Sequence, residues 1–264
     1  MSGRILEGKC ALITGSTQGL GLAAARRFAA SGCHVVLNGF ANAEAISAIR
    51  SAIEAEHHVR TLYCGADLRW HEEIEAMVRE AEETFGAVDI VINNAVVRHA
   101  APLEKFTPEE WDEAIAVNLS AAFDTIRLTL PKMRKRNWGR IINVSSIYGF
   151  RATPNRAAYV TTKTALLGLT RAVAIETLGQ NITCNAVCPG TVPTPVHEAR
   201  MAQIMAEQSV PRAAAEQQFL MGKQPTGRFI QPDDVAALMV FLCGSESRDI
   251  TGAALPMDGG WSAA

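Results

Sequence analysis

Short runs rich in β-branched residues alternate along the whole chain with longer stretches of helical periodicity. The periodicity predicts strands at Cys10–Thr14, His34–Asn38, Val59–Cys64, Asp89–Asn93, Arg140–Ser145, Ile182–Val187 and about Ala253–Met257. It predicts helices at Leu20–Ala30, Ala43–Glu56, His71–Phe85, Trp111–Arg136, Tyr159–Leu178 and Pro232–Cys243. This alternation is typical of βαβ units, and the nearly all-apolar strands indicate a sheet buried on both faces. We therefore predict an α/β fold with one doubly wound, seven-stranded parallel sheet.

The composition fits a single globular domain. The chain has 264 residues, 48% of them hydrophobic, and 25 Lys and Arg against 27 Asp and Glu give a net charge of −2. Domains usually have about 100–200 residues, but α/β folds often reach this size as one unit. The balanced charge argues against nucleic-acid binding, which needs a basic excess. We expect one domain over residues 1–264.

Nothing in the sequence predicts a membrane span, a secretory leader or a metal site. It contains no run of about 18 apolar residues, no apolar stretch at its start and no His, Cys, Asp and Glu cluster with metal-ligand spacing. Cysteines without a C-x-x-C pair are typical of free thiols in a reducing compartment, and the six are Cys10, Cys33, Cys64, Cys184, Cys188 and Cys243. We expect a cytoplasmic protein that binds no metal.

The stretch from about 193 to 227 departs from the strand–helix rhythm. It contains four prolines and short helical patches rich in Met, Ala and Gln. A long insertion after a strand often closes over a binding site. We predict a helical substrate lid here, with packing in an oligomer as the alternative.

Three glycines follow the first predicted strand and open the first predicted helix. Gly15 permits a sharp strand-to-helix turn, Gly19 permits close approach of the backbone to a pyrophosphate, and Gly21 permits tight packing of helix and strand. The free N–H groups and the helix dipole at this turn attract an anion. The pattern predicts a dinucleotide site.

The spacing T-G-x-x-x-G-x-G over residues 14–21 resembles the short-chain dehydrogenase/reductase family. Other motifs of that family are Asp67-Leu68, Asn93-Asn94-Ala95 (followed by Val96 where Gly is usual) and Pro189-Gly190 with Val192 and Thr194. The resemblance implies a Rossmann-type domain and a cofactor held by Gly15, Thr17, Gln18, Gly19, Leu20, Phe40, Asp67, Leu68, Asn94, Tyr159, Lys163, Pro189, Val192 and Thr194.

The residues after the second predicted strand indicate which nicotinamide cofactor is preferred. The 2′-phosphate of NADP needs a nearby Arg or Lys. The segment 37–42 reads Leu-Asn-Gly-Phe-Ala-Asn, positions 16–18 are neutral, and no Lys or Arg lies between Leu37 and Arg50. The usual acid for the ribose of NAD is absent too. We predict NAD.

Tyr159 and Lys163 are four residues apart on a predicted helix, so both side chains lie on one face. A free Tyr titrates near pH 10, which is too high for a general base at neutral pH. A neighbouring ammonium favours the phenolate and lowers this pKa. Tyr159 can then take a proton from an alcohol or give one to a carbonyl.

The resemblance adds two further members to this catalytic set. Ser146, at the end of the fifth predicted strand, matches the Ser that hydrogen-bonds the substrate oxygen. Asn118 matches the Asn that positions the Lys through water. The implied enzyme is an oxidoreductase that passes a hydride between an alcohol carbon and the nicotinamide.

Within the family, segments 37–40, 65–68, 223–225 and 258–261 are similar to the D-3-hydroxybutyrate dehydrogenases. That branch holds its substrate carboxylate with Gln, His, Lys and Gln side chains. This sequence has Arg98, Tyr148, Arg156 and Arg200 at those positions, and Thr191 where that branch has a Trp. Because Arg binds carboxylate, phosphonate or sulfonate oxygens bidentately, we predict a small anionic substrate such as a 3-hydroxybutyrate-like hydroxy acid. Arg98 and Arg200 could instead point to solvent or pair with Glu198.

Alternative functions remain open at this stage. Arg156 and Arg200 are similar to the pair that binds a sulfonate in 2-hydroxypropyl-coenzyme M dehydrogenases, so a sulfonate- or phosphonate-bearing alcohol is one alternative. Another is reduction of 3-oxoacyl groups on an acidic carrier protein that docks on the basic run 132–140, which otherwise is an ordinary cationic helix end. A cofactor-sensing regulator would be expected to lack the Tyr or the Lys. His197, at the start of the predicted lid, could face the substrate. The family resemblance also implies a homotetramer.

Overall fold

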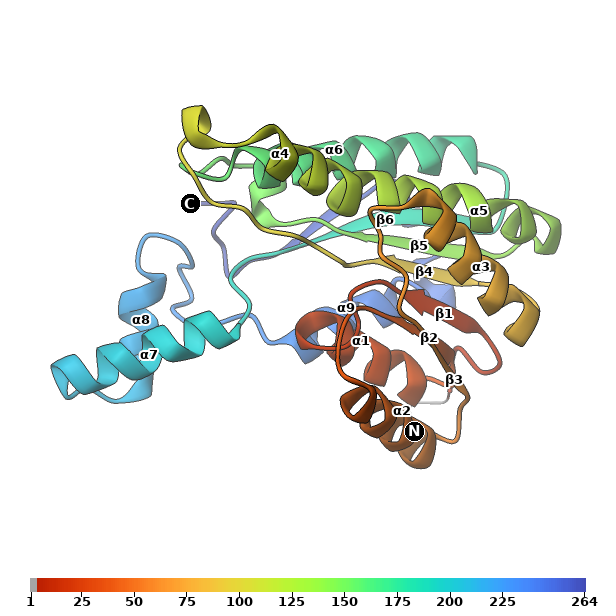
Figure 1. Cartoon of the computed structure of the whole chain (residues 1–264), viewed down its shortest axis with the longest axis horizontal. Helices are drawn as coiled ribbons and strands as arrows, with labels where there is room; N and C mark the ends of the chain where they lie inside the picture. The colour runs from red at the N-terminus through yellow and green to blue at the C-terminus, as the bar shows by residue number, and fades with distance from the viewer. Residues whose placement is uncertain (1–3) are drawn as a thin grey trace.

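Seven parallel strands form one sheet in the order β3-β2-β1-β4-β5-β6-β7 (Figure 1). The computed structural model describes residues 4–264. The strands are β1 (Cys10–Ile13), β2 (His34–Asn38), β3 (Thr61–Cys64), β4 (Ile90–Asn93), β5 (Gly139–Val144), β6 (Ile182–Pro189) and β7 (Ala254–Met257). Every predicted strand is present within a few residues, and the predicted doubly wound Rossmann-type architecture is confirmed.

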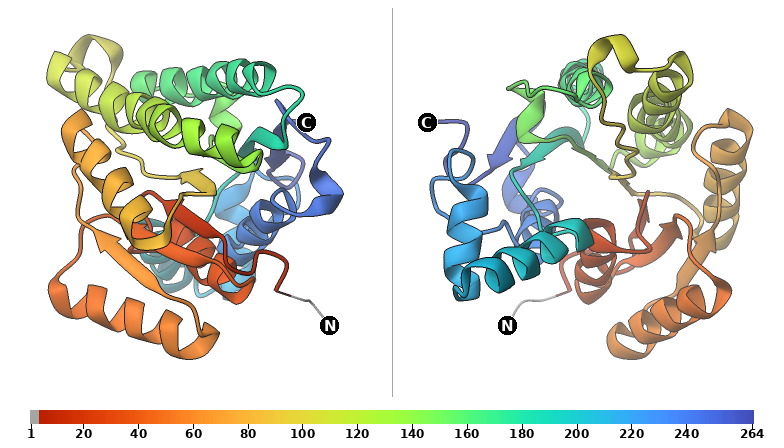
Figure 2. Two further views of the ribbon diagram at one scale, coloured as in Figure 1. Left: turned by 90° about the vertical axis from the view of Figure 1, so that its right-hand side faces the viewer. Right: turned by 60° about the vertical axis from the view of Figure 1, so that its left-hand side comes forward.

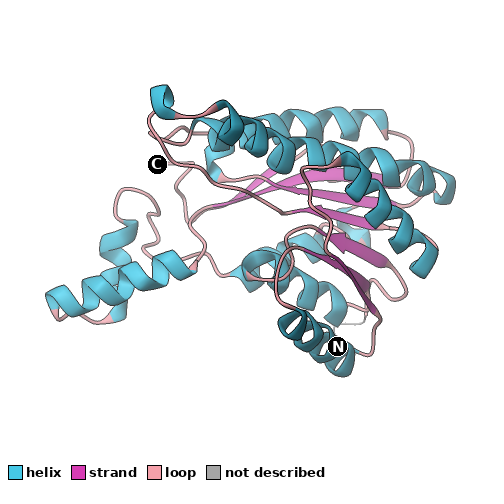
Figure 3. Cartoon of the chain, in the orientation of Figure 1, coloured by secondary structure: helices cyan, strands magenta, loops and turns pink. Residues whose placement is uncertain are grey.

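Helices cover both faces of the sheet, as Figures 2 and 3 show. One layer contains α1 (Gly19–Ala30), α2 (Ala43–His57) and α9 (Pro232–Phe241). The other contains α3 (His71–Phe85), α4 (Pro108–Ile115), α5 (Ala121–Arg136) and α6 (Ala157–Glu176). Three short 3₁₀ turns lie at Leu103–Lys105, Ile147–Gly149 and Ser245–Ser247. In the part of the chain described here, no helix combines the length and apolarity that a membrane span requires.

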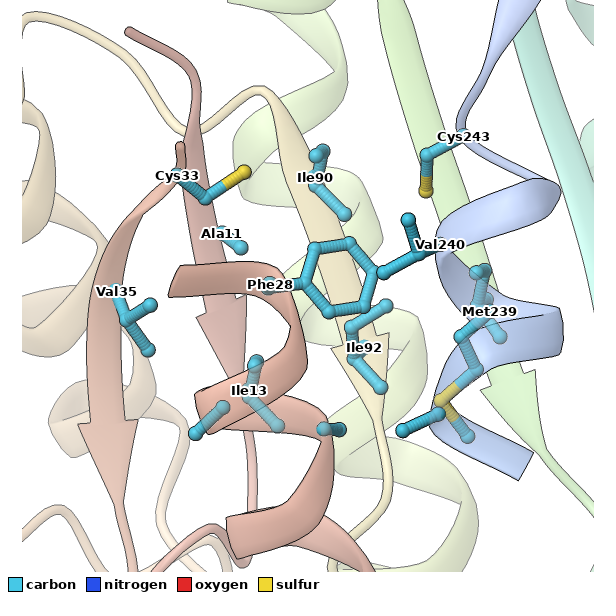
Figure 4. Close-up of a cluster of buried hydrophobic side chains, with 14 of the residues drawn as sticks. Ala11, Ile13, Phe28, Cys33, Val35, Ile90, Ile92, Met239, Val240 and Cys243 are labelled. Carbon is cyan, nitrogen blue, oxygen red and sulfur yellow. The ribbon is translucent and has the colours of Figure 1, made fainter. Parts of the chain in front are cut away.

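Two apolar cores lie on opposite faces of the sheet. In the core beneath α1, the fully buried ring of Phe28 packs between strand residues such as Ile13 and Ile92 and the side of α9 that carries Met239 (Figure 4). The second core joins α3, α5 and α6 to the other face. Burial on both faces explains why the strands are continuously apolar.

The predicted helix Trp111–Arg136 is wrong in its start and in its continuity. Helix α4 already begins at Pro108, because proline is favoured in the first helical turn and Thr107 forms a capping box with Glu110. A π-helical turn over Ala116–Ser120 then separates α4 from α5. The predicted helix Tyr159–Leu178 is present, and it spans Ala157–Glu176.

The segment predicted as a lid forms two helices outside the sheet layers, α7 (Pro195–Gln208) and α8 (Arg212–Leu220). They extend away from the sheet at one side of the molecule (Figure 1). Their buried residues form a separate apolar cluster of Met201, Ile204, Ala215, Leu220 and Phe229. The pair therefore has a small core of its own.

Candidate active site

The glycine turn between β1 and α1 has the shape that the sequence predicts. Gly15 has φ of +63°, and a Cβ there would lie 2.8 Å from the Cα of Ala95. A Cβ on Gly21 would lie 2.1 Å from the carbonyl oxygen of Gly15, which leaves no room for a side chain. Gly19 has φ of +54° and nothing within 4 Å of its Cβ position, so the front of the turn is open.

Asn94 ties this turn to the end of β4. Its Nδ2 donates to the carbonyl oxygens of Thr14 at 2.9 Å and Gly15 at 3.0 Å. The Oγ1 of Thr14 accepts from the backbone N–H groups of Asn94 and Ala95, both at 3.0 Å. Strands β1 and β4 are neighbours where the strand order reverses, which is where doubly wound sheets bind ligands.

The ends of β2 and β3 lie next to the glycine turn, because β2 pairs with β1 and β3 pairs with β2. The buried Asn38 amide donates to the carbonyl oxygens of Cys64 at 3.1 Å and Ala66 at 2.9 Å. Phe40, two residues after the end of β2, is 70% exposed to solvent. Asp67 receives two bonds from Arg69, at 2.9 Å from Nε and 2.5 Å from Nη2, and this guanidinium lowers the pKa of the Asp67 carboxyl. The structural role of Asn38 and the pairing by Arg69 were not predicted.

Tyr159 and Lys163 meet on one face of α6, as their spacing predicts. The Lys163 Nζ lies 5.8 Å from the centre of the Tyr159 ring and donates to the carbonyl oxygen of Val144 at 2.7 Å. Burial of the ammonium, reinforced by the positive charge of Arg98, lowers the pKa of Lys163 to about 7. Lys163 is thus poised between its charged and neutral forms near neutral pH.

Ser146 caps the 3₁₀ turn that follows β5. Its Oγ accepts from the backbone N–H of Tyr148 at 3.2 Å. The Tyr148 ring meets the Tyr159 ring edge-on, with centroids 6.2 Å apart. The preceding Ser145 donates its hydroxyl to the Lys163 carbonyl oxygen at 2.7 Å, so it has a bracing contact to α6. This difference supports the assignment of the substrate-facing role to Ser146.

Asn118 lies in the π-helical turn and is buried. Its Oδ1 accepts the N–H of Val97 at 2.8 Å, and its Nδ2 donates to the Val97 carbonyl at 3.1 Å and to the Thr162 hydroxyl at 3.4 Å. The amide therefore joins the loop after β4 to α6, one residue before Lys163. π-Helical turns are frequent at functional sites, but the periodicity of the sequence does not reveal one.

The predicted substrate-binding arginines have different surroundings. The Arg98 guanidinium carbon lies 5.7 Å from the centre of the Tyr159 ring, and the half-buried Arg156 precedes the first turn of α6. Within residues 4–264, neither forms an ion pair with a carboxylate. The exposed Arg200 donates to Gln203 on its own helix at 2.7 Å. Glu198, the alternative partner of Arg98 and Arg200, binds Arg212 instead.

The segment between β6 and α7 joins the sheet to the predicted lid. The buried Gln224 accepts from the N–H of Thr191 and donates to the Arg228 carbonyl, both at 2.5 Å. Thr194 caps α7, and its hydroxyl accepts the N–H of His197 at 3.3 Å. The His197 ring contacts the Val192 carbonyl at 2.9 Å. Pro189 ends β6, so this segment starts at the same sheet edge as the glycine turn.

Comparisons with known proteins agree with this geometry. Residues 15–262 match the family described as enoyl-(acyl carrier protein) reductase. The chain is 43% identical to D-beta-hydroxybutyrate dehydrogenase of Cupriavidus necator, covering 98% of this chain and 100% of that protein. It is 32% identical to the 3-oxoacyl-[acyl-carrier-protein] reductase of Thermotoga maritima, covering 97% and 98%. The chain belongs to the short-chain dehydrogenase/reductase family.

A solved structure supports the same conclusion. L-Sorbose reductase from Gluconobacter frateurii, complexed with NADPH and L-sorbose, matches with a TM-score of 0.90 and 29% identity over 98% of each chain. The predicted family and enzyme class are confirmed, and this short-chain dehydrogenase/reductase is an oxidoreductase.

The glycine turn fits the nicotinamide cofactor of this family. The open space before Gly19 and the unobstructed start of α1 leave room for a pyrophosphate, whereas a Cβ on Gly15 or Gly21 would close the turn. Among the described residues, no group of His, Cys, Asp and Glu could hold a metal ion.

Proposed function

We propose that this short-chain dehydrogenase/reductase interconverts a small anionic secondary alcohol, such as a 3-hydroxybutyrate-like hydroxy acid, and its ketone with NAD. The observation that carries the proposal is the Arg98 guanidinium, which lies 5.7 Å from the Tyr159 ring and forms no ion pair in the described chain. An anionic group bound there would bring its alcohol carbon close to the phenol. The 43% and 40% identity to two D-beta-hydroxybutyrate dehydrogenases supports the same substrate class.

Tyr159 transfers the proton in this mechanism. Its phenolate accepts the proton of the alcohol in oxidation, and its phenol returns a proton to the carbonyl oxygen in reduction. The Ser146 hydroxyl holds the same oxygen, and the charged form of Lys163 places a positive charge 5.8 Å from the centre of the Tyr159 ring. The bound nicotinamide supplies the hydride acceptor or donor. Asn118 holds the loop that carries Arg98 against α6.

The end of β2 supports NAD as the cofactor. Asn38, Gly39 and Phe40 are uncharged, and Arg50 is engaged with the hydroxyl and carbonyl of Thr61 at 3.1 and 3.0 Å. A 2′-phosphate would therefore meet no free cation from these residues. A higher kcat/KM with NADP than with NAD would contradict this assignment.

Two alternative substrates differ in their support. A sulfonate or phosphonate would suit Arg98 and Arg156 as well as a carboxylate does. Carrier-bound 3-oxoacyl groups have less support, although the Thermotoga maritima relative is such a reductase. In the basic run, Lys132 pairs with Glu82 at 2.9 Å and Arg136 with Asp89 at 3.2 Å. These charges stabilise the end of α5 and are less available to an acidic carrier.

The proposal also includes a lid, a homotetramer and a cytoplasmic location. The separate core of α7 and α8 supports their movement as a unit over the cleft. Exposed apolar side chains on α5 and α6, including Phe123 and Ile175, support pairing of these helices between subunits. Light scattering of the purified protein would give the mass of the assembly.

The experiment compares 3-hydroxybutyrate with its neutral amide, 3-hydroxybutyramide, as substrates in the presence of NAD. We expect Arg156→Ala to raise the KM for the acid at least tenfold, because about 1.5–3 kcal/mol of charge-assisted hydrogen bonding is lost. The KM for the amide should change less than threefold. The control is Arg26→Ala, which removes an exposed arginine of α1 that lies outside the proposed substrate site. Equal effects of Arg156→Ala on both substrates would contradict the anionic assignment.

A further inference from the structure

The loop that follows β4 is anchored to three different elements, through Asn94, Val97 and His99. Asn94 binds the glycine turn. Val97 exchanges two hydrogen bonds with the Asn118 amide in the π-helical turn. His99 binds helix α4 through Glu113. Arg98 lies between the last two of these anchors, and its guanidinium faces the Tyr159 ring.

The anchor at His99 consists of a half-buried imidazole next to two carboxylates. The His99 Nε2 lies 2.8 Å from the Glu113 Oε2, and its Nδ1 lies 3.7 Å from the Glu110 Oε1. The ring also meets Phe106 edge-on, with centroids 6.2 Å apart. Only 24% of the His99 side chain is exposed. These contacts fix the ring on three sides, so the backbone at residue 99 has little freedom.

Arg69 extends the same network toward the cofactor side of the cleft. Its Nη1 lies 3.8 Å from the Glu113 Oε1, and its other nitrogens bind the Asp67 carboxylate. Glu113 therefore has a positively charged or hydrogen-bonding partner on each side. These contacts hold the Glu113 carboxylate at the place where it binds His99.

We propose that His99 is a positioning residue that holds Arg98 in place for the anionic group of the substrate by binding its loop to Glu113 of α4. The proposal rests on the proposed function of Arg98. The backbone of Arg98 is held on one side by the Asn118–Val97 pair and on the other by His99. Arg98 is itself exposed, so without the second anchor its long side chain would sample more rotamers and lose affinity for the anion.

The test is a double-mutant cycle between residues 98 and 99 with 3-hydroxybutyrate, 3-hydroxybutyramide and NAD. We expect His99→Leu to raise the KM for the acid about tenfold and the KM for the amide less than twofold, with kcat within about twofold. His99→Gln can still donate to Glu113 and should recover most of the loss. In the Arg98→Gln background, His99→Leu should have no further effect on the acid.

Glu113→Ala provides a second variant that removes the same contact from the other side, and it should reproduce the selective rise in KM. Its matched control is Glu109→Ala, an exposed residue in the first turn of α4 without an ion pair in the described chain. A thermal melt and an NADH titration of each variant distinguish loss of folding from loss of positioning.

The outcomes separate the two proposals. Suppose that Arg98→Gln raises the KM for the acid. If His99→Leu then changes the KM for acid and amide equally, or raises the KM for the acid just as much in the Arg98→Gln background, the positioning role is wrong and the proposed function stands. If Arg98→Gln leaves the acid unaffected, the anion-binding role of Arg98 and the role of His99 both fail. If the wild-type enzyme turns over neither substrate, the proposed function itself is contradicted.

Discussion

The ammonium of Lys163 lies buried behind Tyr159, where it donates to the Val144 carbonyl oxygen at 2.7 Å. A lysine in water has a pKa near 10.4, but burial and the charge of Arg98 lower the pKa of Lys163 to about 7. The surroundings that favour the neutral form of Lys163 also hold this side chain beside the phenol of Tyr159. At the scale of single residues, the chemistry of this site depends on desolvation as much as on residue type.

Lys163 should make the stability of the cofactor-free protein depend on pH. Its pKa is lower in the folded state than in the unfolded chain, so above pH 7 the unfolded chain binds more protons and stability rises with pH. Between pH 7 and 8.5, we expect the free energy of unfolding of the wild type to gain on that of Lys163→Met by up to about 1 kcal/mol per pH unit. Urea unfolding at several pH values measures this difference, and parallel curves would contradict it.

Replacement of Tyr159 by Phe should remove most of the turnover. General acid–base catalysis contributes about 10²–10⁴-fold to rate, so we expect kcat to fall by at least a hundredfold. The Kd for NADH should stay within about threefold, because the ring still packs against Tyr148. Stopped-flow turnover and NADH fluorescence give the two values. A variant that retains wild-type kcat would exclude Tyr159 as the proton carrier.

At the scale of elements, the turn between β1 and α1 and the π-helical turn determine the site. The first brings the open end of α1 to the edge of the sheet, and the second turns the Asn118 amide toward the loop after β4. Both are short irregular segments held by long regular ones. Their geometry therefore depends on a few close contacts, which single substitutions can break.

Gly21→Ala tests the first of these contacts. The added methyl group would lie 2.1 Å from the Gly15 carbonyl oxygen, and overpacking of this kind costs about 1–3 kcal/mol or more. We expect a lower melting temperature and weaker NADH binding. Gly168→Ala is the matched control, since a Cβ on this helical glycine has nothing within 4 Å in the single chain. Because Gly168 lies on the same face of α6 as Ile175, light scattering should give this variant the same assembly mass as the wild type. That variant should gain about 0.5–1 kcal/mol from helix propensity, and equal destabilisation by both variants would contradict the steric argument.

At the scale of the whole molecule, the parallel sheet brings the ends of β1, β4, β5 and β6 to one edge, where the residues proposed to hold cofactor and substrate lie. Helices α7 and α8 lie beside this edge and have a core separate from the two cores of the sheet. Their attachment includes the bonds of Gln224 to Thr191 and Arg228. A unit with a small core can open without unfolding the sheet.

Amide hydrogen exchange should therefore divide the molecule into two parts. We expect residues 195–220 to exchange at least tenfold faster than β4 and β5, because fewer buried contacts protect them. NADH with a bound substrate analogue should slow the exchange of this segment if it closes over the cleft. Protection equal to that of the sheet, or no change on binding, would exclude a mobile lid.

The sequence by itself determined the sheet, the glycine turn and the Tyr159–Lys163 pair, because strand burial, glycine conformation and helical spacing are local properties. Local patterns could not predict the break between α4 and α5 or the surface orientation of Arg200.

The tertiary structure alone decided which side chains meet across elements. Asn118 binds Val97, His99 binds Glu113, and Gln224 binds the loop after β6, at sequence separations of 21, 14 and 33 residues. Such contacts depend on how helices pack on the sheet. The placement of Arg98 beside Tyr159 is therefore a consequence of the packed fold, although each residue was identified in the sequence.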